Sequence, residues 1–300
     1  MGGASDAVDD AVVSIETTPD AAISELCTGV VVAPRVVLTA GHCAAHQDAA
    51  TLVVGVGFIA NRPTRTVAVA STRVLPSFTG DSAIDGPAGR DLGVILLAED
   101  VGVAPVAIAP APSVGSVAQL VGFGQSSVTN LDTRGTRRSG AVNIAGVCST
   151  LLEFGDATVN ACHGDSGGPL LVDGRLVGIV SWGRTFACDP PSYAVRVDAY
   201  SDWIDAIIAG SPDAGCASCD KDASDCTSIT TDAGIDASHD AASEASADAS
   251  PSPAASDASG CALSAHRSNE STFLSALLIV AALLARRTRP PLVSRGKEPV

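Results

Sequence analysis

The sequence predicts an all-β barrel or sandwich over residues 11 to about 200, and two observations support this fold class. Ten short runs rich in Val, Ile and Leu follow one another at close spacing, and Gly, Pro, Asp and Ser separate them. Many short apolar segments with turn residues between them are typical of antiparallel all-β folds. The runs occupy residues 11–15, 27–33, 36–40, 51–56, 66–74, 92–97, 118–124, 169–172, 176–182 and 193–197.

One segment departs from the strand pattern. Within residues 198–210 the apolar side chains recur at spacings of one and four, which is typical of one face of a helix. These side chains are Trp203, Ile204, Ile207 and Ile208. Asp198 stands where it would cap the start of this helix, and Gly210 stands where it would end it. We therefore expect a terminal helix that packs on the β domain.

The composition changes after residue 210. Residues 211–260 hold nine Asp and one Glu against one Lys, with almost nothing to bury. Such a segment is expected to be a disordered, solvated spacer. The whole chain carries a formal net charge of −15, which argues against nucleic acid as a partner because phosphate binding needs Lys and Arg. The expected organisation is a domain at 1–210, the spacer at 211–260 and a tail at 261–300.

The tail contains Cys261, then the apolar run 273–285, then an arginine cluster. Thirteen helical residues span about 20 Å, which is less than the roughly 30 Å hydrocarbon core of a bilayer. The order of cysteine, short hydrophobic helix and arginines resembles the C-terminal sorting tails first recognised in myxobacteria. That resemblance implies sorting at Cys261 and transient membrane association through 273–285. An ordinary single-pass anchor is the alternative.

Nine cysteines in 300 residues indicate an oxidising compartment. No Cys/His array has the spacing of a zinc site, and the single CxxC formed by Cys216 and Cys219 is weak support for a metal. We expect no metal and no cofactor.

Three stretches contain the residues of a nucleophilic catalyst: LTAGHC at 38–43, DLGVILL at 91–97 and CHGDSGGPLL at 162–171. A serine hydroxyl needs an adjacent base before it can attack a carbonyl carbon. Histidine is the natural base near neutral pH, and a buried carboxylate orients it. The chain offers His42, Asp91 and Ser166 for these roles. Glycines around Ser166 allow backbone N–H groups to point at one spot.

In this order the three motifs resemble the chymotrypsin/trypsin family of serine peptidases, over residues 2 to about 209. The resemblance implies a double six-stranded antiparallel β-barrel with the active site between the barrels. His42 would be the general base and acid, Asp91 its orienting partner and Ser166 the nucleophile. The N–H groups of Gly164 and Ser166 would form the oxyanion hole. The resemblance also implies a monomer that cleaves protein or peptide substrates.

The same resemblance implies two disulfides, Cys27–Cys43 beside the catalytic histidine and Cys162–Cys188 at the substrate pocket. Ser181, Trp182 and Gly183 match the strand that pairs with an extended substrate. Cys148 has no counterpart within the domain, so we expect it to pair with one of the cysteines beyond residue 210.

Asn160 stands six residues before the nucleophile, where trypsin-type enzymes have the Asp that pairs with substrate Arg or Lys. A neutral amide cannot compensate a buried cation, and Ser192 stands where the family often has Gly and would narrow the pocket. We therefore expect a small or medium uncharged side chain at the cleaved position. Asp189 could restore some basic preference if its loop folds inward.

Asp165 directly precedes the nucleophile, and in this family that Asp pairs with an ammonium group freed by proteolysis. Mature members begin with two aliphatic residues and then Gly-Gly, and Met1-Gly2-Gly3 resembles the end of that motif. We therefore expect an upstream signal peptide, a pro-segment and an aliphatic residue before Met1.

Two other functions compete with an extracytoplasmic endopeptidase, secreted or anchored through the tail. One is a catalytically silent homologue that binds a partner through the same cleft. The other is a surface protein whose role lies in the acidic spacer. The intact residues His42, Asp91, Gly164 and Ser166 favour the peptidase.

Overall fold

The computed structural model describes residues 2–18, 25–45, 48–130, 133–185 and 187–211, with the backbone of 227–228. The predicted sorting tail at 261–300, with its apolar run 273–285, lies outside these residues, as does nearly all of the spacer. Across the described ranges no helix is long and apolar enough to cross a membrane.

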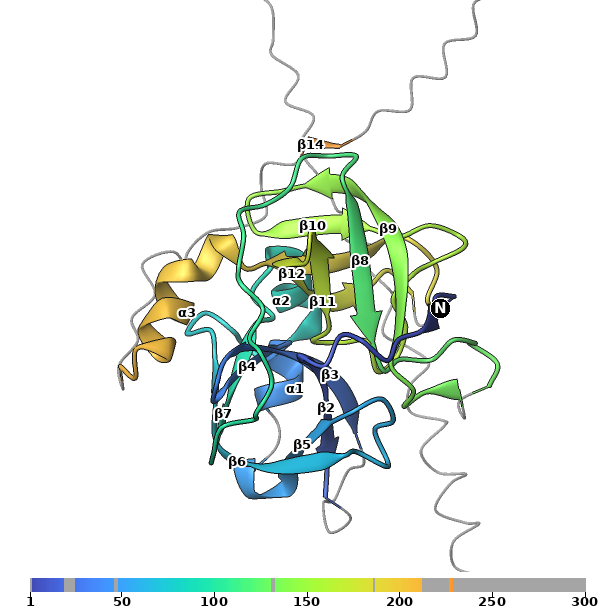
Figure 1. Ribbon diagram of the computed structural model, residues 1–300. Helices are drawn as coiled ribbons and strands as arrows, with labels where there is room; N and C mark the ends of the chain where they lie inside the picture. The colour runs from blue at the N-terminus through green and yellow to red at the C-terminus, as the bar shows by residue number, and fades with distance from the viewer. Residues whose placement is uncertain are drawn as a thin grey trace, which may run out of the picture. The chain divides into compact units, whose positions relative to one another are not determined.

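Six strands close into a first antiparallel barrel, drawn in blue tones in Figure 1. Their order around it is β2 (Val12–Thr17), β3 (Leu26–Ala33), β4 (Val36–Thr39), β7 (Gly93–Leu97), β6 (Arg65–Val74) and β5 (Leu52–Val56). Small β-branched residues fill the interior, because a narrow barrel has room for Val and Ile but little for aromatic rings. Val13, Val31, Val54 and Ile95 are among these buried side chains.

A second barrel, drawn in green and yellow in Figure 1, is built from the later strands. Around it run β8 (Val117–Gly122), β9 (Arg138–Val147), β10 (Leu151–Phe154), β13 (Ser192–Arg196), β12 (Arg175–Gly183) and β11 (Pro169–Val172), and β11 pairs with β8. The short strands β1 (Ala4–Ser5) and β14 (Thr227–Ser228) add to β9. The double six-stranded barrel is therefore confirmed, and the sandwich alternative is excluded.

All ten predicted apolar runs coincide with strands, whereas β9 and β10 lie outside those runs. In β9 the only fully buried apolar side chains are Val142 and Ile144, and Gly, Ser and Asn fill many of the other positions. A strand with so few apolar residues gives a weak sequence signal. Two short helices, α1 (Gly41–Ala45) and α2 (Ser82–Ala88), were also not predicted.

The terminal helix is confirmed, with two corrections. A 3-10 turn at Asp198–Tyr200 leads into α3 (Ser201–Ile208), and Gly210 follows its end with φ +78°. Asp198 does not cap the helix, because its carboxylate pairs with Arg196 and accepts the Ala111 N–H. Ile208 is 40% exposed, so it lies at the edge of the buried face rather than within it.

A separate apolar cluster, outside the interior of the first barrel, joins the two barrels and α3. It contains Leu38 and Leu92 from the first barrel, Phe123 from the loop after β8, and Tyr200 and Trp203 from the terminal helical segment. All five side chains are buried. This contact fixes the end of β4 and the start of β7 against the loops of the second barrel, where the candidate catalytic residues lie.

The two predicted disulfides are present, Cys27–Cys43 and Cys162–Cys188. Cys148 is disulfide-bonded as well, and its partner lies outside the described residues. The pairing of β14 with β9 bears on that partner, because Thr227 lies opposite Val147 and Ser228 opposite Gly146. If this antiparallel register were continued by one residue, it would set position 226 opposite Cys148.

We therefore predict a Cys148–Cys226 disulfide that ties the start of the spacer to the second barrel. Peptide mapping without reduction is expected to yield the Cys148 and Cys226 peptides as one mass that separates on reduction. The Cys27–Cys43 pair is the internal control. A free Cys148 thiol, or a bond from it to Cys216, Cys219 or Cys261, would contradict the register argument.

Candidate functional site

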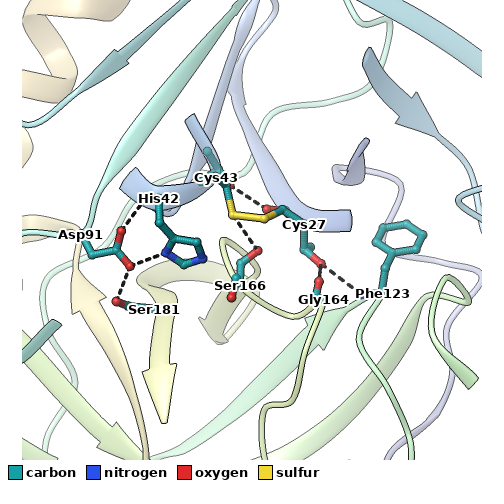
Figure 2. The surroundings of a disulfide bond; sticks show 10 residues. Cys27, His42, Cys43, Asp91, Phe123, Gly164, Ser166 and Ser181 are labelled. Atoms are coloured by element: carbon teal, nitrogen blue, oxygen red, sulfur yellow. Dashed lines mark hydrogen bonds and ion pairs between the residues drawn. A yellow bond between two sulfur atoms is a disulfide. The ribbon is translucent and has the colours of Figure 1, made fainter. Parts of the chain in front are cut away.

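A carboxylate and an imidazole meet at the first barrel's edge. His42 lies on α1, directly after β4, and Asp91 lies just before β7. The Asp91 carboxylate accepts hydrogen bonds from the His42 backbone N–H at 2.8 Å and lies 2.8 Å from His42 Nδ1. It also accepts the Ser181 hydroxyl at 2.6 Å. Asp91 is therefore fixed by three contacts, and Nδ1 is held as the protonated nitrogen of the imidazole (Figure 2).

Two glycines allow this close approach. A Cβ on Gly41 would lie 3.0 Å from Asp91 Oδ1 and from the ring of Phe78. A Cβ on Gly93 would lie 2.8 Å from Ala44 Cβ, where α1 packs on β7. The glycines of the TAGHC and DLGV motifs are thus required by packing, and they place His42 against Asp91.

His42 and Asp91 each shift the pKa of the other. Burial alone would lower the pKa of His42, but the hydrogen bond and charge of Asp91, with the charge of Glu25, raise it above the ordinary value of a histidine. Burial alone would raise the pKa of Asp91, but His42 and Ser181 together hold it below its usual value. An imidazole with these partners can accept a proton at Nε2 and remain stable as a cation.

Ser166 lies in a tight glycine-rich turn before β11. Gly164 and Gly167 have φ of +99° and +82°, a backbone region that favours glycine. A Cβ on Gly164 would lie 3.1 Å from Gly124 Cα, and one on Gly167 would lie 2.2 Å from Thr28 O. The GDSGG motif therefore packs on both barrels at once.

Thr28 of the first barrel holds this turn in place. Its hydroxyl donates to Gly164 O at 2.7 Å and accepts the Phe123 N–H at 3.1 Å. Its own backbone N–H donates to Ser166 O at 2.8 Å. Thr28 was not predicted to support the site, because nothing in the run 27–33 separates it from an ordinary strand residue.

Two amides at the turn are free to bind a ligand. Within the described chain, the N–H groups of Gly164 and Ser166 donate to no protein acceptor, whereas those of Asp165, Gly167 and Gly168 each do. Figure 2 draws the His42 imidazole between Asp91 and Ser166. The His42 ring is hydrogen-bonded to Asp91 through Nδ1. Among the described residues, no hydrogen bond joins the His42 ring to the Ser166 hydroxyl.

Asp165 is buried behind the turn, 7% exposed. Its carboxylate accepts the Gly124 N–H at 2.8 Å and the Cys162 N–H at 2.9 Å. Burial raises the pKa of this carboxyl, and the positive charge of the N-terminus, together with the two amide hydrogen bonds, offsets part of that rise. Gly2 and Gly3 line the same small cavity of about 20 Å³ as Asp165.

A cavity of about 410 Å³ opens beside Ser166. Ser181, Trp182, Gly183 and Ser192, all predicted to bind substrate, line it. The other predicted pocket residue, Asn160, lies behind the cavity lining. It is 1% exposed, and its Nδ2 donates to the backbone oxygen of Cys188, which does line the cavity, at 2.9 Å.

The described residues that line the cavity include no Asp or Glu. Arg184 contributes a positive charge to the lining. Asp189 is exposed and outside the lining, where its carboxylate accepts the Thr185 hydroxyl at 3.1 Å. The loop that carries Asp189 therefore does not fold inward.

The helix α2 was missed by sequence reasoning, although it forms one side of the cavity through Ser82, Ala83 and Pro87. Asp81 caps its start by accepting the Ala83 N–H, and Gly89 ends it with φ +67°. This spacing of Asp and Gly around a short segment is a helix signal that could have been read from the sequence.

Within α2, Asp85 is fully buried, and its carboxylate accepts the backbone N–H groups of Thr79 and Gly80. Gly86 lies against Trp182, where a Cβ would come within 3.1 Å of the indole. The other side of that indole is stacked on Tyr193, with ring centroids 4.4 Å apart. Trp182 is thus fixed between two neighbours at the edge of the cavity.

Two Cys/His groups have ligand atoms close enough to hold a metal ion: Cys27 with His42 and Cys43, and Cys162 with His163 and Cys188. In both groups the sulfur atoms are joined as disulfides. A disulfide sulfur is not a thiolate, so neither group offers the donors that Zn²⁺ prefers.

Comparison with known proteins gives a consistent picture. The family model described as Trypsin matches residues 4–204. Snake venom serine proteinase 14 of Crotalus adamanteus is 31% identical over 215 residues, which cover 64% of this chain and 81% of the relative. Venom plasminogen activator LV-PA of Lachesis muta muta is 31% identical over 217 residues, with the same coverage.

A solved structure of the scabies mite inactivated protease paralogue S-D1 superposes with a TM-score of 0.61. It covers 70% of this chain and 97% of that chain at 15% identity. At this identity the likeness shows the fold alone.

We predict that His42 titrates above 6.5 and that Asp91→Asn lowers its pKa, because the variant removes the charge that stabilises the imidazolium. NMR titration of the His42 ring protons measures this directly and does not depend on activity. Asp205→Asn, which changes an exposed carboxylate on α3, is the control and should leave the titration unchanged. An equal pKa in the wild type and Asp91→Asn would contradict the assignment.

Proposed function

The chain belongs to the trypsin family of serine peptidases and is a serine endopeptidase, and we propose that it cleaves peptide bonds with His42, Asp91 and Ser166. The observation that carries this proposal is the buried Asp91 carboxylate 2.8 Å from His42 Nδ1, with the other edge of the imidazole toward Ser166 in Figure 2. Its substrates are proteins or peptides.

In the proposed first half-reaction, Ser166 Oγ attacks the scissile carbonyl carbon while His42 Nε2 takes the hydroxyl proton. Asp91 stabilises the imidazolium that results. The carbonyl oxygen becomes an oxyanion, for which the free N–H groups of Gly164 and Ser166 are the available donors. His42 then gives its proton to the amine nitrogen, the C–N bond breaks, and Ser166 remains as an acyl ester.

In the second half-reaction a water molecule replaces the departed amine. His42 Nε2 removes a proton from the water, and the oxygen attacks the ester carbon through the same oxyanion site. The C–O bond to Ser166 breaks, and the proton on His42 returns to the serine oxygen. The products are the amino-terminal fragment of the substrate, which now ends in a new carboxyl group, and the free enzyme.

We infer a preference for small or medium uncharged side chains at the cleaved position. The described cavity lining has no carboxylate, and the buried Asn160 behind it is neutral. A substrate Arg or Lys would be desolvated there without a counter-charge, which is costly. A peptide-library profile dominated by cleavage after Arg or Lys would contradict this inference.

Asp165 is proposed as the partner of an ammonium group released by proteolysis ahead of Gly2. Its buried carboxylate accepts two backbone amides, and a cation would stabilise its charged form further. Gly2 and Gly3 already line its cavity. Such pairing would make the order of the turn at 164–167, here called the oxyanion turn, depend on processing of the chain.

The proposed site of action is outside the cytoplasm. The disulfides Cys27–Cys43 and Cys162–Cys188 persist in oxidising compartments and are rare in the cytosol. Secretion or anchoring at the cell surface through the tail remains the associated proposal.

Ser166→Ala is expected to lower kcat by roughly a million-fold, because the triad acts as one unit. A fluorophosphonate probe should label the wild type at Ser166, as located by mass spectrometry, and should not label the variant. Ser201→Ala, an exposed serine at the start of α3, is the matched control and should be labelled like the wild type. A folded wild type that remains unlabelled even after processing ahead of Gly2 would instead support the silent homologue.

A further inference from the structure

Residues 2–12 form an N-terminal segment that lies along the start of β9 (Figure 1). Its strand β1 pairs Ala4 with Ser139 and Ser5 with Arg138. Two consecutive arginines at this point, one before β9 and one at its first residue, turn their side chains toward the segment. Neither has a role in the chemistry proposed above.

The first of them, Arg137, is a buried cation with 0% exposure. Its guanidinium donates to Asp6 O at 3.1 Å, to Val12 O at 3.0 Å and to Gly57 O at 3.4 Å. It forms an ion pair with Asp10, whose carboxylate oxygen lies 3.2 Å from Nη2. Burial of a guanidinium is costly unless each donor is satisfied in a fixed geometry. Arg137 therefore locks the N-terminal segment to the loop after β5.

The second, Arg138, reaches the very start of the described chain. It donates to Gly2 O at 3.2 Å and to Gly3 O at 2.7 Å. It also lines the small cavity that contains Asp165. Arg138 is thus the side chain that joins the N-terminal segment to the cavity behind the oxyanion turn.

The glycine backbone makes this contact specific. Gly2 and Gly3 have φ of +71° and +70°. A Cβ on Gly2 would lie 2.2 Å from Thr158 O, and one on Gly3 would lie 2.7 Å from Ser139 O. A side chain at either position would therefore push the segment away from its place along β9. The carbonyl oxygens of Gly2 and Gly3 can accept from Arg138 because both residues are glycine.

We propose that Arg137 and Arg138 are positioning residues, which hold the N-terminal segment on β9 and thereby keep the Asp165 cavity closed behind Gly164 and Ser166. They act on catalysis through Asp165 and touch no substrate. This inference rests on the proposed function for its effect on activity, and on the hydrogen bonds above for its structural part.

The test compares Arg138→Gln with Arg73→Gln in the full chain. Arg73 is exposed on β6, and its hydrogen bond goes to the neighbouring Thr72 O. Hydrogen exchange is followed at the Gly124 and Cys162 amides, both of which donate to Asp165. The rate of fluorophosphonate labelling at Ser166 is measured in parallel.

In R138Q we expect exchange at both amides to rise, and Ser166 labelling to slow, by about tenfold each, a size typical of coupling through packed networks. R73Q should match the wild type. Arg138→Lys should be intermediate, because an ammonium group lacks the fork that spans both carbonyls. Faster exchange confined to residues 4–6, with labelling unchanged, would overturn the proposal.

Gly3→Ala provides a second route, since it keeps both arginines and displaces the segment through the clash with Ser139 O. It should reproduce the R138Q result, and it decides the matter if R138Q does not fold. A processed wild type that is unlabelled at Ser166 would refute the proposed catalytic role of Ser166. The exchange result would then still confirm or refute the positioning roles by itself.

Discussion

The buried carboxylate of Asp165 is the interaction on which the site depends. It accepts the N–H groups of Gly124 and Cys162, and so ties the loop after β8 to the turn before β11. A Cβ on Gly122 or Gly124 would lie 2.2 or 2.3 Å from it, which requires glycine at both positions. A buried charge that lost these donors would be strongly destabilising. The conformation of Gly164 and Ser166 is therefore set by a residue that does no chemistry.

The second constraint is that each barrel supplies half of the site. His42 and Asp91 belong to the first barrel, whereas Ser166 and Ser181 belong to the second. Hydrogen bonds that cross between them include Ser181 to Asp91, the Thr28 hydroxyl to Gly164 O and the Thr28 N–H to Ser166 O. The apolar cluster shared by the barrels and α3 holds these polar contacts at fixed distances. Packing far from the cavity thus has a direct effect on the alignment of nucleophile and base.

The sequence predicted the parts of this arrangement that have strong local patterns. Alternating apolar runs gave the strands, and the motifs around His42, Asp91 and Ser166 identified the residues that the fold brings together. β9 was missed because few of its side chains are buried. Asn160 was expected at the base of the pocket, and only the fold shows that it is buried there with its amide donating to Cys188 O, a residue of the cavity lining. The contacts of Thr28 with Phe123 and of Arg137 with Val12 span more than 90 residues of chain, and no local sequence pattern indicates them.

The most direct test of this account is Asp165→Asn, measured by the rate of fluorophosphonate labelling at Ser166 on protein that circular dichroism shows to be folded. The amide cannot replace a carboxylate that accepts two backbone N–H groups, so the oxyanion turn should lose its order. We predict labelling slower by roughly 100-fold, the size seen when one oxyanion donor is lost, with the His42 titration unchanged. Labelling at the wild-type rate would contradict the claim that Asp165 organises the site.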